Sequence, residues 1–486
     1  MSGIGWRFEN SYTALPPQMY TRLNPVEVAE PELVILNHTL AKEMGLDFSK
    51  LSSQGCAELF TGNRIPEGAD PLAQAYGGHQ FGHFSILGDG RAIVLGEHLT
   101  PAEQRLDIQF KGSGQTPYSR NGDGRAALGP MLREYLISEA MHQLGIPTTR
   151  SLAVATTGET VFREELLPGA ILTRVAASHL RVGTFQLLSM QKQLKALESL
   201  LAYALKRHEP NWNGDGNPAL ALLKGVMDRQ LDLVIHWLRV GFIHGVMNTD
   251  NMTISGETID YGPCAFMDRY ALRTVFSSID HAGRYAYGNQ PLMIKWNIAR
   301  LAEALLPLLH EEQPQAIKMA EEAIEAFNDQ YKARWMAMMR SKLGLEGDQE
   351  GDNDLFGDLL NWMEQHSADY TNTFCSLMAP SPAQERIYQE PVFQGWLERW
   401  QQRRQRQPMS LADSLLLMQQ HNPQIIPRNH HVEEALKVAS DSGDLEPLQQ
   451  LLEALQDPYT PHPKQAPFQD PPSGDAERVY QTFCGT

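Results

Sequence analysis

Apolar and polar residues alternate along much of the N-terminal half of the chain, with the two-residue period of strands. The stretch 106–111 alternates up to Lys111, which predicts a half-buried strand with Lys111 on the polar face, away from the core. Apolar runs on either side of Gly88-Asp89-Gly90 predict a hairpin. Three further strands are expected over 152–155, 160–163 and 170–175.

A helical period replaces this alternation in two places. After Gly129-Pro130, leucine and alanine recur every fourth residue, which predicts a helix with Glu134 off its apolar stripe, as a candidate partner for Lys111. From residue 186 onward the chain is expected to be helical, with one helix begun by Asn217-Pro218 and closed by Gly241. The first 75 residues show no strong period beyond a helix expected near 30–42. Strands followed by helices predict an α+β fold.

Composition narrows the function classes. A chain of 486 residues with 42% hydrophobic and 20% charged residues is expected to be globular, with two or more domains or lobes. Its net charge of −17 argues against non-specific binding of nucleic acid or anionic membranes. The sequence offers neither a membrane-spanning apolar stretch nor a signal peptide, so a cytoplasmic location is expected. Four cysteines without a C-x-x-C motif suggest reduced thiols.

The most informative stretch runs from His244 to Gly262. Asn251 follows His244 by seven residues, as the metal-binding Asn follows the His of the kinase H-R-D-L-x-x-x-N loop, and Asp260-Tyr261-Gly262 stands where kinases carry D-F-G. Short strands at 252–254 and 258–259 are expected to form a hairpin that brings Asn251 and Asp260 together. An amide oxygen, a carboxylate and nucleotide phosphates would suit Mg²⁺. The alternative is a plain Asx turn with an ordinary loop carboxylate.

One kinase group is missing from this stretch. The position two residues after His244, where a kinase has its catalytic Asp, is Val246, which can neither accept a proton nor orient a hydroxyl. The sequence therefore indicates the metal-binding half of a phosphoryl-transfer site without its usual base.

Cationic and glycine-rich segments upstream suggest a place for phosphates. The Gly88-Asp89-Gly90-Arg91 turn could present bare backbone N–H groups, and Lys111 resembles the lysine of the kinase V-A-I-K strand. Arg174 and Arg181 could grip a triphosphate through forked hydrogen bonds. Salt bridges to nearby acids and a solvated strand-end lysine are the competing interpretations.

With these motifs assembled, the chain resembles the selenoprotein O family, pseudokinases that act as protein AMP-transferases. The most specific pieces are 76–91, 111–120, 172–176 and 244–262. The resemblance implies a protein kinase-like fold with a β-rich small lobe and a helical large lobe with a C-terminal extension. The corresponding division is an N-terminal extension (1–75), a small lobe (76–182), a large lobe (183–456) and a Pro-rich tail (457–486) with Cys484.

The resemblance also implies a reaction. ATP would bind in reversed orientation, so that AMP passes to a Ser, Thr or Tyr hydroxyl of a protein substrate, and Asp250 would be the proton acceptor, which answers the gap at Val246. Asn251 and Asp260 would bind Mg²⁺ or Mn²⁺. The nucleotide would contact Asp260 and the carried-over residues Gly88, Gly90, Arg91, Lys111, Asp123, Gly124, Arg174 and Arg181.

Three alternatives remain at this point. They are UMP transfer from UTP with Mn²⁺, ordinary phosphorylation, which Val246 disfavours, and a catalytically silent pseudokinase scaffold. Cys264 and Cys484 are further hypothesised to form a reversible, redox-regulating disulfide, with two free thiols as the alternative.

Overall fold

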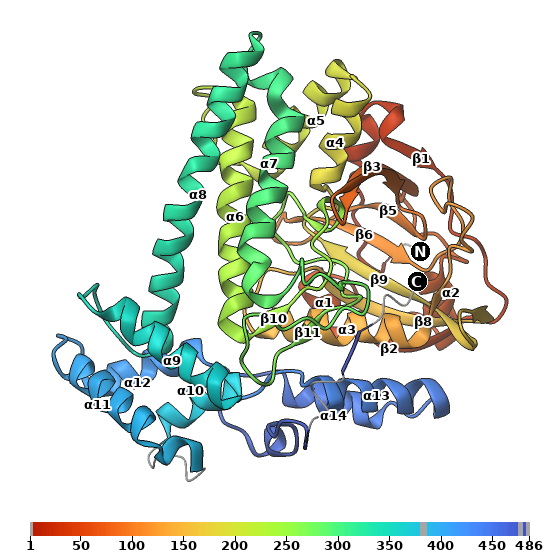
Figure 1. The fold of residues 1–486 in the computed structure, drawn as a ribbon. Helices are drawn as coiled ribbons and strands as arrows, with labels where there is room; N and C mark the ends of the chain where they lie inside the picture. Colours follow the sequence, from red (N-terminus) through yellow and green to blue (C-terminus); the bar gives the residue numbers. More distant parts are fainter. Residues whose placement is uncertain (1–2, 380–385, 475–479, 483–486) are drawn as a thin grey trace.

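The structure, a computed structural model, describes residues 3–379, 386–474 and 480–482. It is a mixed α+β protein in which an antiparallel sheet in the N-terminal part is followed by a largely helical C-terminal part (Figure 1). The expected α+β class is therefore confirmed. The described helices lack the length of apolar sequence that crossing a bilayer requires.

The sheet has the strand order β1-β3-β5-β6-β9-β8-β2, with β4 paired to β3 and β7 paired to β9. Two of these strands, at the two ends of the order, come from the first 75 residues of the chain. The bounds are β1 (Tyr20–Arg22), β2 (Glu32–Leu36), β3 (Leu72–Gln80), β4 (His83–Gly88), β5 (Ala92–Leu99), β6 (Arg105–Lys111), β7 (Ala126–Ala127), β8 (Arg150–Phe162) and β9 (Leu166–Ala176).

Two expectations about strands are wrong, and the helix expected near 30–42 is confirmed only in its second half. The hairpin turn lies at Phe81-Gly82, between β3 and β4, and Gly88-Asp89-Gly90 instead leads from β4 to β5, which pairs with β3 and β6. The stretches 152–155 and 160–163 belong to one strand, β8, which tolerates a register shift between Thr156 and Thr160. Residues 30–42 form β2 and then the short helix α1, because β2 finds pairing partners on β8 that its sequence does not reveal.

The helices agree better with their sequence signals. In α6 the Asn217 side chain accepts a hydrogen bond from the Leu220 backbone N–H, Pro218 opens the helix and Gly241 closes it with φ 74°. The bounds are α1 (His38–Glu43), α2 (Ser53–Thr61), α3 (Leu128–Gln143), α4 (Val182–Met190), α5 (Leu194–His208), α6 (Pro218–Val240), α7 (Gln290–Leu309), α8 (Gln313–Lys342), α9 (Asp352–His366), α10 (Tyr370–Met378), α11 (Pro391–Gln405), α12 (Leu411–His421), α13 (Asn429–Ser442) and α14 (Glu446–Ala454).

One continuous apolar core joins the sheet to the helices. It includes Leu132 and Leu136 of α3, Phe185 of α4, Leu231 of α6 and Leu301 of α7, all fully or almost fully buried. Helices α6, α7 and α8 run side by side, α4 packs between α7 and strand β3, and α13 and α14 lie along α3 (Figure 1). Because burial of this shared apolar surface holds the two parts together, the loops between them have a defined place.

Candidate functional site

A cavity of about 530 Å³ lies where the sheet meets the loop 246–263. The residues around it come from β3, β6, β9, the β4–β5 connection and the loop 118–125. All the residues to which the resemblance gives a nucleotide, metal or proton-acceptor role line this one cavity, namely Gly88, Gly90, Arg91, Lys111, Asp123, Gly124, Arg174, Arg181, Asp250, Asn251 and Asp260. Folding therefore brings together segments more than 150 positions apart in the chain.

The lining of this cavity is rich in positive charge. Among the described residues it carries seven cationic side chains against four carboxylates, in a chain whose net charge is −17. The cations are Arg91, Lys111, Arg120, Arg125, Arg163, Arg174 and Arg181. Concentrated guanidinium and ammonium groups in a concave surface attract anions and suit a polyphosphate.

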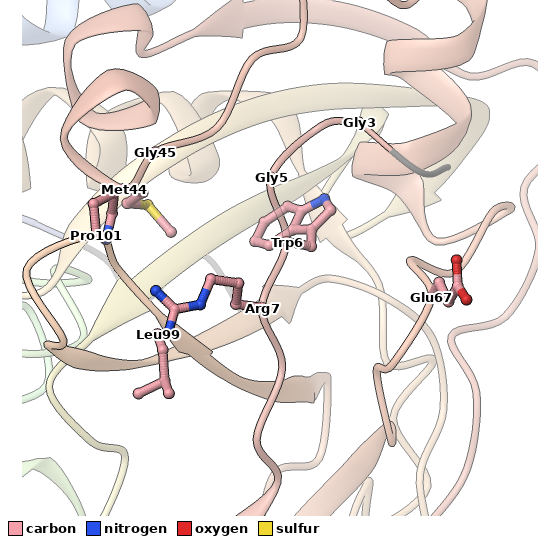
Figure 2. A pocket seen from close by; sticks show the side chains of 9 residues that line it. All are labelled: Gly3, Gly5, Trp6, Arg7, Met44, Gly45, Glu67, Leu99 and Pro101. Atoms are coloured by element: carbon pink, nitrogen blue, oxygen red, sulfur yellow. The ribbon is translucent and has the colours of Figure 1, made fainter.

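A second cavity, of about 490 Å³, lies elsewhere (Figure 2). Its side chains come from the N-terminal segment that contains Trp6 and Arg7, from Met44-Gly45, from Glu67 and from the end of β5. Arg7 is paired with Glu103 at 2.9 Å, and the cavity contains none of the residues singled out from the sequence. The candidate site residues therefore belong to the first cavity.

Lys111, which lines the first cavity, forms an ion pair with Glu134 of α3, as the sequence predicted. Lys111 Nζ lies 2.7 Å from Glu134 Oε2 and 2.8 Å from Asp260 Oδ1. The polar face of β6 was expected to be solvated, and this is wrong, because Lys111 is only 7% exposed. The same face is closed further along by Asp107, which pairs with Arg207 of α5 at 2.6 Å.

Asp260 is the centre of this charged cluster. Its Oδ1 accepts from Arg174 Nη2 at 2.7 Å as well as from Lys111, and its Oδ2 accepts from Arg181 Nη1 at 2.8 Å. Arg174 Nε also donates to Glu134 Oε1 at 2.7 Å. The competing interpretation of the two arginines, salt bridges to acids, thus describes their contacts, although both guanidiniums also line the cavity.

Asp260 has a lowered pKa and an unusual backbone conformation. Burial opposes the charged form, but Arg174, Lys111 and Arg181 together hold the pKa of Asp260 well below its usual range. The residue adopts φ 63°, a left-handed conformation that non-glycine residues rarely take. Three cationic partners and a strained backbone exclude the alternative of an ordinary loop carboxylate.

The segment between Asn251 and Asp260 is not the expected hairpin. Thr253 forms a bridge with Arg181, and Thr258 forms one with Thr148, so the two short stretches pair with different parts of the chain. Tertiary contacts replace the local pairing because both stretches are buried between the sheet and α6. Asn251 and Asp260 nevertheless line the same cavity.

Asp250 has the properties of a proton acceptor. The residue is 8% exposed, and burial raises the pKa of its carboxyl to about 6, with Arg181 opposing the shift. Within the described part of the chain, its Oδ1 has no hydrogen-bond partner. A carboxyl group with a pKa near 6 is ionised at neutral pH and can accept a proton from a hydroxyl.

The donor set of Asn251 and Asp260 fits a hard divalent cation. Asn251 Nδ2 donates to Val246 O at 3.0 Å, which leaves the amide oxygen to face a ligand. Amide and carboxylate oxygens suit Mg²⁺ or Mn²⁺. The described residues contain no cluster of three or more His, Cys, Asp or Glu side chains able to hold a metal, so phosphate and water oxygens would complete the shell.

Sequence reasoning missed several groups in the same cavity. Arg163 Nη1 lies 2.8 Å from Asp123 Oδ2, Arg125 Nη2 lies 2.9 Å from Glu159 Oε2, and burial raises the pKa of Asp89 to about 6. No local motif gave these residues a role, although Asp89 lies within the Gly88-Asp89-Gly90 motif. Each carries a charge at the end of a strand or in a glycine-rich loop, and only the folded structure shows that these charges lie in the same cavity.

The hypothesised Cys264–Cys484 disulfide involves one residue outside the described part of the chain, Cys484. Cys264 is a free, fully buried thiol, and burial raises its pKa to about 11. The nearby tail residue Thr482 lies along the segment that follows Gly262, because its Oγ1 donates to Pro263 O at 2.7 Å and its N–H donates to Phe276 O at 2.8 Å. The disulfide remains a hypothesis.

Comparison with known proteins identifies the family. Residues 4–456 match the family described as Protein adenylyltransferase SelO. The chain is also similar to proteins named Protein nucleotidyltransferase YdiU. It is 59% identical to that of Nitrosococcus oceani, with 99% of this chain and 98% of the relative covered, and 56% identical to that of Geobacillus kaustophilus, with 99% of each covered.

These matches span almost the entire chain and include all the segments on which the resemblance to selenoprotein O proteins rested. The cavity, its cationic lining and the buried Lys111–Glu134 pair lie within the matched residues. The chain therefore belongs to the SelO family of protein adenylyltransferases and is a nucleotidyltransferase.

Proposed function

We propose that the cavity binds ATP in reversed orientation and that the enzyme transfers AMP to a Ser, Thr or Tyr hydroxyl of a protein substrate. The observation that carries this proposal is the convergence of all the carried-over residues on one cation-rich cavity. A base at Asp250 rather than at the position of Val246 favours attack at a different phosphorus from the one that kinases use.

Under this proposal the cationic side chains hold and orient the triphosphate. Lys111, Arg174 and Arg181 already converge on Asp260, so their charged ends are fixed before the nucleotide arrives. Preorganised donors of this kind stabilise negative charge that develops during phosphoryl transfer without having to reorganise. The hydroxyl oxygen of the protein substrate attacks the α-phosphorus while Asp250 accepts the hydroxyl proton, and pyrophosphate leaves.

Asn251 and Asp260 would hold the Mg²⁺ or Mn²⁺ ion. When bound, the cation neutralises charge on the phosphate oxygens. Both Asp260 oxygens already accept from cationic side chains, so each oxygen would be shared between those side chains and the metal.

We further propose a kinase-like, two-lobed organisation, with a small lobe over 76–182, a helical large lobe over 183–456, an N-terminal extension and a C-terminal tail. The start of α4 at Val182 and the placement of the cavity between the sheet and the loop 246–263 support this division.

Labelled nucleotides test the proposed reaction. The enzyme is incubated with a mixture of candidate acceptor proteins and with ATP labelled at either the α- or the γ-phosphate, with UTP labelled at the α-phosphate in parallel. Protein-bound label from α-labelled ATP alone is the expected result. Label from the γ position would indicate a kinase, label from UTP would indicate UMP transfer, and no label from any of them would indicate a scaffold.

A further inference from the structure

The end of β3 and the turn that follows it grip the loop that carries Asp250. Three successive residues of this segment each donate a hydrogen bond to one residue of the loop 248–250. The bonds run from His79 N to Thr249 Oγ1 at 2.7 Å, from Gln80 Nε2 to Asp250 Oδ2 at 3.4 Å and from Phe81 N to Asn248 Oδ1 at 3.1 Å. Strand and loop are about 170 positions apart in the sequence.

The same loop is held from two other directions. Tyr285 OH donates to Asn248 Oδ1 at 2.5 Å, and Arg181 Nη1 donates to the backbone oxygen of Asp250 at 2.6 Å. The loop is thus fixed at its first and last residues, while the segment 79–81 sets how far it approaches the sheet.

Gly78 allows this approach because it has no side chain. A Cβ atom at Gly78 would lie 2.6 Å from Asp250 Oδ1 and 2.9 Å from Asp250 Cβ, both closer than real Cβ contacts. The neighbouring Gly77 differs. A Cβ there would meet the end of the Phe84 ring at 2.5 Å and the Ser85 backbone oxygen at 3.3 Å, so it would displace a flexible side chain and not Asp250. Successive side chains of a strand point to opposite faces, so methyl groups added at the two glycines would lie on opposite faces of β3.

We propose that Gly78 and Gln80 are positioning residues for the transfer reaction, which set the place and orientation of the Asp250 carboxylate relative to the acceptor hydroxyl. Gly78 packs against one carboxylate oxygen, and Gln80 holds the other by its amide. The inference rests on the proposed function, because it assigns Asp250 the role of proton acceptor. Neither residue is proposed to touch the transferred phosphoryl group.

The matched substitutions Gly78→Ala and Gly77→Ala test this inference in the full-length protein. Each adds one methyl group to the same strand, and only the first displaces Asp250. Gly78→Ala is expected to lower kcat for AMP transfer about 100-fold, since a misplacement of about 1 Å costs that much. The KM for ATP and the Kd for α,β-methylene-ATP are expected to stay within about twofold of wild type, because the substitution leaves the contacts that bind the nucleotide unchanged. Gly77→Ala is expected to keep a near wild-type kcat.

A second variant covers the case in which Gly78→Ala does not fold. Gln80→Leu keeps the size of the side chain and removes the amide, so kcat is expected to fall about tenfold with an unchanged KM for ATP. Thermal unfolding of each variant reports whether it is folded.

Distinct results would overturn the inference. One is equal kcat for Gly78→Ala and Gly77→Ala, another is loss of α,β-methylene-ATP binding in Gly78→Ala, and a third is wild-type kcat in Gln80→Leu. Absence of protein-bound α-label with the wild-type enzyme would instead remove the proposed function, and the inference with it. The wild-type arm therefore separates the two failures.

Discussion

Replacing Glu134 by Gln removes the negative charge that pairs with Lys111 and Arg174, two cations of the cavity lining, and leaves the shape of the side chain almost unchanged. Glu134 is 2% exposed and accepts from Lys111 Nζ at 2.7 Å and from Arg174 Nε at 2.7 Å. After the replacement, Lys111, Arg174 and Arg181 share the single carboxylate of Asp260. Breaking a buried pair by removing one partner costs about 3–5 kcal/mol, so the variant is expected to lose roughly this much stability.

The loss of orientation is expected to reach the chemistry. A Lys111 ammonium that is no longer held against Glu134 has more positions available, and about 2.7 kcal/mol of lost transition-state stabilisation corresponds to roughly 100-fold in rate. We therefore expect Glu134→Gln to lower kcat/KM for AMP transfer from α-labelled ATP about 100-fold.

The control is Glu139→Gln, in the same helix α3. Glu139 is 8% exposed and pairs with Arg150 at 2.7 Å and 2.9 Å, and none of its hydrogen-bond partners lines the cavity, whereas both cationic partners of Glu134 do. Glu139→Gln should lower the urea midpoint of unfolding to a similar degree while keeping transfer within about threefold of wild type, since it leaves the cavity intact. Equal transfer rates in the two folded variants would show that the Glu134 pair does not act on the reaction.

The remaining predictions address the metal, the base and the thiols. Asp260→Asn should lower transfer about 1,000-fold and remove its dependence on Mg²⁺ concentration, because the charge shared by three cations is lost; a Mg²⁺ titration identical to wild type would contradict the assignment. Asp250 must be ionised to accept a proton and burial raises its pKa to about 6, so the transfer rate should fall about tenfold per pH unit below pH 6 and level off above it; a rate that is flat from pH 5 to 8 excludes Asp250 as the base. Because burial raises the pKa of Cys264 to about 11, its thiol should react slowly with iodoacetamide in the folded protein and quickly in urea. Peptide mapping under non-reducing conditions tests the hypothesised disulfide. Because Cys264 is buried and its pKa is raised, a Cys264–Cys484 pair should form only slowly on oxidation, and free thiols at both positions after prolonged oxidation would dispose of the disulfide.

Sequence reasoning succeeded where the signal is local. The helix α3, the Asn217 cap and the Gly241 end of α6 follow from side chains within a few residues of each other, and the structure has all three, although α3 is buried on nearly every side and not along one stripe. It failed where the pairing partner of a segment lies far away in the sequence. β4 pairs with β3 and not with β5, and residues 253 and 258 bridge to 181 and 148, because buried backbone groups take the partners that the whole fold supplies.

Candidate residues of the cavity could be identified from the amino-acid sequence. The spacing to His244 and the D-Y-G triplet single out Asn251 and Asp260 without any coordinates. Their environment was decided only by the tertiary structure. Asp260 meets Lys111, Arg174 and Arg181 from three separate segments, and Gly78 meets Asp250 across about 170 positions. Charge, burial and hydrogen bonding act over a few ångströms in space, so the pKa of a carboxylate depends on neighbours that its position in the chain does not reveal.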